Sequence, residues 1–69
     1  MKISARNKLR GTVVEVTKGA TTAHVRIDLG GGAVMTASIT NEAVDELKLA
    51  KSQTVYAIVK ASDVMVGVE

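Results

Sequence analysis

Hydrophobic and polar residues alternate most regularly between residues 22 and 29. Every second side chain from Ala23 onward is apolar, and the side chains between them are polar or charged. A period of two predicts a strand with one buried face. Three glycines follow, and then a second alternating segment, Ala33–Thr40. The two segments together predict a β-hairpin.

A strand is also expected over residues 9–18, which are rich in β-branched side chains. Simple alternation places Val14 and Val16 on one of its faces and Val13 and Glu15 on the other.

Two more strands are expected near the C-terminus. Residues 54–60 are apolar on both faces, which in so small a chain predicts that one face meets a neighbouring subunit. Val64, Val66 and Val68 then alternate in a last short strand.

The period of the pattern changes after Thr40. Ala43, Val44 and Leu47 form one stripe at helical spacing, and Thr40 or Asn41 is suited to cap the helix. Acidic residues in the early turns and lysines at the end agree with the helix dipole. A short helix of about two to three turns is therefore expected.

Five strands with a helix after the third follow the connectivity of an OB-fold barrel. We expect an all-β fold, a small five-stranded OB-fold barrel with one short helix between strands 3 and 4. Residues 1–69 contain no linker, repeat or low-complexity stretch, which predicts a single domain.

The chain is small for an independent domain. At 69 residues, without cysteine and with a single histidine, it has neither a disulfide nor a structural zinc site to reinforce a light core. A homo-oligomer is therefore expected. No apolar run approaches the length that spans a bilayer and no apolar signal region is present, so the sequence predicts a soluble, cytoplasmic protein.

Enzymatic chemistry is disfavoured. The only imidazole, His24, falls on the polar face of a predicted strand, and the acids Glu42, Asp45 and Glu46 are explained by the start of the helix. The three glycines lie between strands without the helix and Lys-Ser/Thr pair of a phosphate loop. No catalytic residue and no direct protein ligand to a metal is predicted.

The charge distribution points to an anion. Lys2, Arg6, Lys8 and Arg10 all precede the first acid, Glu15. A segment that offers hydroxyl, guanidinium and amide donors without a carboxylate suits a small tetrahedral oxyanion. On composition alone, a solvated basic arm is the preferred explanation of this segment.

Two other places offer donors. The helix start at Thr40 has backbone N–H groups, and Lys60 ends an otherwise apolar strand, where burial would need an anion. Capping by Thr40 and snorkelling of Lys60 explain both residues equally well. Sequence spacing does not show whether these places meet.

A second class of function stays open, a small structural or nucleic-acid-binding OB module. Single-stranded nucleic acid is bound on aromatic platforms, and Tyr56 is the only aromatic residue. Nucleic acid is therefore not the expected partner. A membrane is not expected either, because no apolar run is long enough to span a bilayer.

Four motifs resemble the molbindin (Mop) family in order and spacing. They are SARNKLRGTVVEV at residues 4–16, AxIT at 37–40, LKL at 47–49 and VKA at 59–61. The resemblance covers residues 2–68. It implies an OB-fold module that binds molybdate, and usually tungstate, for storage in the cytoplasm without catalysis. No organic cofactor is expected, because the sequence lacks the aromatic stacking surface that a pterin would use; whether a pterin is ever bound stays open. The resemblance also implies hexamers assembled as trimers of dimers, with the anions at subunit interfaces.

The resemblance also implies the site residues. The principal site would comprise Ser4, Arg6, Asn7, Thr40, Ala43 and Lys60. Several relatives have serine where this chain has Ala43, so one hydroxyl donor is lost. A second site, near symmetry axes, would comprise Gly19, Ala20, Thr21 and His24.

Overall fold

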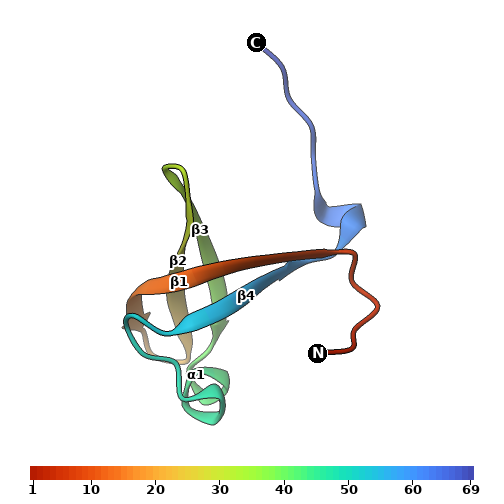
Figure 1. Ribbon diagram of the computed structural model, residues 1–69. Helices are drawn as coiled ribbons and strands as arrows, with labels where there is room; N and C mark the ends of the chain where they lie inside the picture. Colours follow the sequence, from red (N-terminus) through yellow and green to blue (C-terminus); the bar gives the residue numbers. More distant parts are fainter.

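The computed structural model describes residues 1–69, and its backbone forms four strands and one short α-helix (Figure 1). In chain order the elements are β1 (Asn7–Lys18), β2 (Thr22–Gly30), β3 (Ala33–Thr40), α1 (Asn41–Leu47), β4 (Thr54–Val59) and the 3-10 turn η1 (Ala61–Asp63). The strands form one curled antiparallel sheet in the order β3-β2-β1-β4. The result is an all-β, OB-like fold with α1 between β3 and β4.

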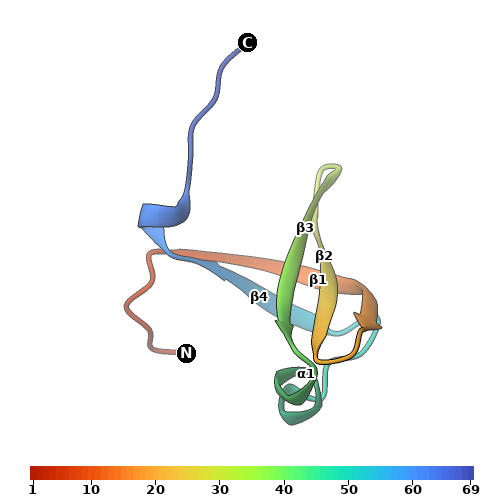
Figure 2. The ribbon, with the colours of Figure 1, turned by 180° about the vertical axis from the view of Figure 1, so that it is seen from behind.

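The long strand β1 organises the sheet. Its first half, from Asn7 to Thr12, pairs with β4, and its second half, from Thr12 to Lys18, pairs with β2. Both views show β1 crossing the molecule from the end that carries the two chain termini towards the side where α1 lies (Figures 1 and 2).

The expected fifth strand does not form within the chain. Residues 64–69 leave the sheet after η1 and pair with no strand. A valine alternation is a local preference, whereas a strand needs a partner edge for its backbone groups. The sheet therefore has two free edges, β3 and β4, and is not a closed barrel.

The predicted facing of β2 is confirmed. Ala23, Val25 and Ile27 are buried, with at most 5% of each residue exposed, and the polar residues between them are exposed. Together with three residues from other elements they form the core: Val13, Val44 and Ala57.

The predicted facing of β1 is wrong at one point. Val13 pairs with Ile27 and Val16 pairs with Val25, so three steps along β1 match two steps along β2. A β-bulge at Val14 absorbs the extra residue and brings Val13 and Val16 to the same face. Period-two reasoning does not detect such an insertion.

The helix has the predicted length of about two turns but is less buried than its apolar stripe predicts. It has seven residues, of which only Val44 is buried, and Leu47 is 61% exposed. Lys48 ends it in the left-handed conformation at φ 52°. No helix has the length and apolar character needed to cross a membrane.

Two glycines form the turn between β2 and β3. Gly31 and Gly32 have φ values of 61° and 86°, which a tight two-residue hairpin turn between β2 and β3 requires. Strand β4 ends at Val59, so Lys60 lies just beyond the strand rather than in it.

Candidate anion-binding site

The start of β1 and the end of β4 lie side by side and bring four of the predicted site residues together. Asn7 is the cross-strand partner of Val59, and Asn7 Nδ2 donates a hydrogen bond to Val59 O at 3.3 Å. Arg6 precedes the first of these residues and Lys60 follows the second. Two cations and an amide thus share one end of the sheet.

The donors at this end are largely free. Arg6 Nε donates to Ser4 O at 2.9 Å, and the two terminal nitrogens of its guanidinium have no partner in the chain. The Ser4 hydroxyl and the Lys60 ammonium also make no hydrogen bond. Asp63 lies three residues beyond Lys60 but forms no ion pair with it. An anion can therefore approach both cations without competition from a carboxylate.

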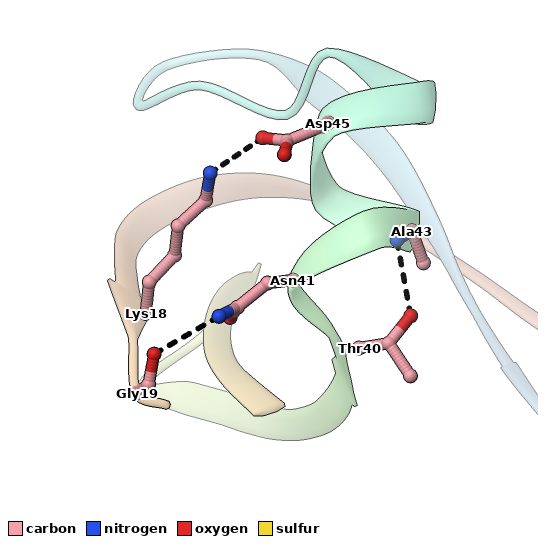
Figure 3. Close-up of polar contacts among 6 residues, drawn as sticks. All are labelled: Lys18, Gly19, Thr40, Asn41, Ala43 and Asp45. Atoms are coloured by element: carbon pink, nitrogen blue, oxygen red, sulfur yellow. Dashed lines mark hydrogen bonds and ion pairs between the residues drawn. The ribbon is translucent and has the colours of Figure 1, made fainter. Parts of the chain in front are cut away.

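The chain's one ion pair is elsewhere. Lys18 Nζ contacts Asp45 Oδ1 between the end of β1 and α1, with both side chains well exposed (Figure 3). An exposed pair of this kind adds little stability.

The helix start lies apart from this cluster. Thr40 Oγ1 accepts a hydrogen bond from the Ala43 backbone N–H at 3.0 Å (Figure 3). The Ala43 N–H is thus already engaged, while the Thr40 hydroxyl keeps its own hydrogen to donate. Because α1 lies away from the end where β1 begins (Figures 1 and 2), one chain does not bring Thr40 and Ala43 together with the Arg6 cluster.

The residues of the second candidate site separate in the structure. Residues 19–21 connect β1 to β2, and their backbone is tied to Asn41 by two hydrogen bonds of 2.9 Å, from Asn41 Nδ2 to Gly19 O and from Asn41 N to Thr21 O. Ala20 lies in this turn, exposed. His24 is exposed farther along β2, opposite Thr17 and Ser38.

Asn41 has a role that the sequence pattern did not reveal. Its Oδ1 is buried without a hydrogen-bond partner. A buried acceptor of this kind calls for a donor, not for an anion. The sequence pattern indicates Asn41 only as an alternative to Thr40 for the N-terminal cap of the helix.

The carboxylates and the histidine do not converge. No group of three or more His, Asp or Glu side chains lies close enough to hold a metal ion.

Comparison with known families decides the identity of the fold. The family model of the TOBE domain matches residues 3–66. The chain is a TOBE domain of the Mop family. The resemblance seen in the motifs is thereby confirmed.

Relatives of this TOBE domain are similar along its whole length. A probable molybdenum-pterin-binding protein of Haemophilus influenzae is 52% identical over 69 residues, which cover 100% of both chains.

Solved structures agree with this relationship. A molybdate-binding protein from Sporomusa ovata superimposes with a TM-score of 0.89 at 42% identity, covering 96% of this chain and 97% of the other. The cytoplasmic molybdate-binding protein ModG, solved with molybdate bound, has a TM-score of 0.93 at 43% identity. All of this TOBE domain matches 49% of the ModG chain.

Proposed function

We propose that this protein binds molybdate, and tungstate in its place, and stores the anion in the cytoplasm without chemical conversion. The observation that carries the proposal is the pair of unpaired cations, Arg6 and Lys60, which both lie just beyond the Asn7–Val59 contact at one end of the sheet. The molybdate-bound structure of ModG, described as cytoplasmic, supports the choice of anion and compartment.

The cluster suits a tetrahedral dianion that has lost its water. The guanidinium of Arg6 and the ammonium of Lys60 offset the two negative charges. The Ser4 hydroxyl donates a further hydrogen bond. Asn7 Nδ2 uses one of its hydrogens on Val59 O and keeps the other for the anion.

Selectivity follows from the same donor set. A cage of donors leaves the proton of hydrogen phosphate without an acceptor, which weakens phosphate binding. Sulfate carries the same charge and shape as molybdate but is smaller, so a cage sized for molybdate holds it less tightly.

The geometry of one chain leaves this site half built. We place Thr40 and Ala43 of another copy opposite the Arg6 cluster, which makes the anion part of a subunit interface. The Thr40 hydroxyl is the donor that this second copy offers, because the Ala43 N–H is already bound to Thr40 Oγ1. Residues 1–69 act as a single oxyanion-binding module in a homohexamer built as a trimer of dimers.

We also propose a second anion site, which requires several copies of the chain. Gly19, Ala20, Thr21 and His24 would have to meet around a symmetry axis, since one chain spreads them between a turn and the exposed face of β2.

An inorganic anion is preferred to a pterin. Names of several relatives include pterin, and a pterin ring binds by stacking on aromatic side chains. Tyr56, the only aromatic residue, is 52% exposed on β4, away from Arg6 and Lys60 in the strand register.

Isothermal titration calorimetry tests the proposal. Molybdate is titrated into the protein at low and high ionic strength, with sulfate and with phosphate present in excess. We expect binding that neither competitor abolishes and that salt weakens only slightly, because the anion is caged. Binding that collapses with salt, or no heat at all, would refute storage of a caged oxyanion.

A further inference from the structure

The turn between β1 and β2 carries backbone donors that the chain itself does not use. Residues 19–21 are exposed and belong to no strand or helix. The N–H groups of Ala20 and Thr21 donate no hydrogen bond within the chain. Gly19 N–H donates to Thr22 O at 2.8 Å, but Thr22 N–H does not return this bond to Gly19 O. Adjacent free N–H groups in an exposed turn are the kind of donor set that binds an anion.

The carbonyl groups of the same turn are bound on the side of α1. Asn41, the first residue of α1, donates from Nδ2 to Gly19 O at 2.9 Å (Figure 3). Its backbone N–H donates to Thr21 O, also at 2.9 Å. Lys18 adds a third tie, because its ammonium contacts Asp45 farther along α1 (Figure 3). The turn is thus fixed to the helix mainly through Asn41.

Peptide geometry converts this anchoring into a direction for the donors. In a planar trans peptide the C=O of one residue and the N–H of the next residue point in opposite directions. Since Gly19 O points at the side-chain amide of Asn41, the Ala20 N–H points away from that amide. The side chain of Asn41 therefore sets the orientation of a donor that it does not touch.

The buried Oδ1 of Asn41 is a consequence of the same contact. This atom has no hydrogen-bond partner. Rotating the amide by half a turn would replace the donor Nδ2 with the acceptor Oδ1 opposite Gly19 O, which cannot bond to it. A buried acceptor without a donor lowers stability. The tie to the turn, rather than stability alone, accounts for an amide at this position.

We propose that Asn41 is the positioning residue of the second anion site. Within each copy it orients the Ala20 N–H before the anion arrives, so that binding does not have to order the turn. Asn41 itself does not contact the anion. The inference rests on the proposed function, because it names the residue that prepares one of its two sites.

NMR spectroscopy of the ¹⁵N-labelled protein during a molybdate titration tests this assignment. In the wild type, the amide signal of Ala20 should move as the second site fills. Asn41→Leu keeps the approximate size of the side chain and removes both of its polar atoms, and the exposed Gly19 O can bond to water instead. The molybdate concentration that moves the Ala20 signal should then rise roughly tenfold, the lower end of the effect of removing a supporting partner at a metal site. The amide signals of Arg6 and Lys60 should respond as in the wild type.

Gln53→Leu is the matched control. Gln53 Oε1 accepts a hydrogen bond from Ala50 N–H at 2.9 Å, so a side-chain amide supports a different turn there. Its loss should leave the Ala20 response unchanged. Equal responses of Ala20 in the wild type and in Asn41→Leu, or equal effects of Asn41→Leu and Gln53→Leu, would overturn the assignment.

A second variant tests the donor itself. Ala20→Pro removes an N–H that bonds to nothing in the chain, and it should abolish the movement of the Thr21 amide signal. A Thr21 signal that still moves in this variant would contradict the proposal. If Arg6 and Lys60 respond in the wild type while Ala20 does not, the assignment of Asn41 alone is overturned. If no amide responds, molybdate binding is overturned with it.

Discussion

The side-chain nitrogen Nδ2 of Asn7 donates a hydrogen bond across 3.3 Å to the backbone oxygen of Val59. The bond joins the first residue of β1 to the last residue of β4. It holds the neighbouring cations Arg6 and Lys60 at one end of the sheet. The proposed anion site depends on this junction.

Replacing Arg6 tests the contribution of its guanidinium. Arg6→Ala should weaken molybdate binding by about 2 kcal/mol, or roughly 30-fold, because charge-assisted hydrogen bonds are lost. The unfolding temperature should not change, since Arg6 is exposed and bonds only to Ser4 O. Calorimetry and thermal unfolding measure the two effects. Arg26→Ala, which removes an exposed arginine from β2, is the matched control. Equal losses in the two variants would place the site elsewhere.

Two substitutions at Asn7 separate structure from electrostatics. Asn7→Ala should lower the free energy of unfolding by about 1 kcal/mol, because the bond to Val59 O is lost. Asn7→Asp should reduce molybdate affinity further than Asn7→Ala does, because it sets a negative charge next to Arg6, at the end of the sheet that also carries Lys60. Denaturant unfolding and anion titration give both quantities. Unchanged affinity in Asn7→Asp would contradict the proposed position of the anion.

Thr40 has a structural role in its own chain and a proposed binding role towards another. Thr40→Ala should destabilise the fold by about 1 kcal/mol, because the Ala43 N–H loses its cap. It should also weaken molybdate binding, and Thr40→Ser should restore both properties. A Thr40→Ala protein that is less stable but binds molybdate as tightly as before would show that Thr40 caps the helix and does not bind the anion.

Gly11 is required by the close approach of β1 to β2. A Cβ atom at this position would lie 2.6 Å from both Asp28 O and Ile27 Cγ2. Gly11→Ala should therefore lower the free energy of unfolding by about 1–3 kcal/mol through overpacking. Gly67→Ala is the control, since no atom lies within 4 Å of its added methyl group. Denaturant midpoints compare the variants, and equal midpoints would argue against this tight crossing.

The sequence predicted the hairpin because its signals are local. Alternation placed Val25 and Ile27 in the core, and glycines marked the turn between β2 and β3. The prediction of which β1 side chains share a face was wrong at Val14, because a run of similar β-branched residues hides the bulge. The prediction of a fifth strand within the chain was wrong, because strand pairing depends on a neighbouring sheet edge, which no local pattern encodes.

The candidate site was predictable only in part. Arg6 and Lys60 are 54 positions apart in the sequence, and the motif resemblance, not their spacing, joined them. The separation of Thr40 from this cluster is a property of the curled sheet and appears only in three dimensions. The buried Oδ1 of Asn41 was likewise beyond the reach of the pattern.

Crystallography of the molybdate complex, with anomalous diffraction at the molybdenum absorption edge, tests the central claim most directly. The account predicts an anomalous peak within hydrogen-bonding distance of Ser4, Arg6 and Lys60 of one copy, with Thr40 of another copy facing the same anion. A peak at a different place on the surface, or none in crystals of a protein saturated with molybdate, would contradict it.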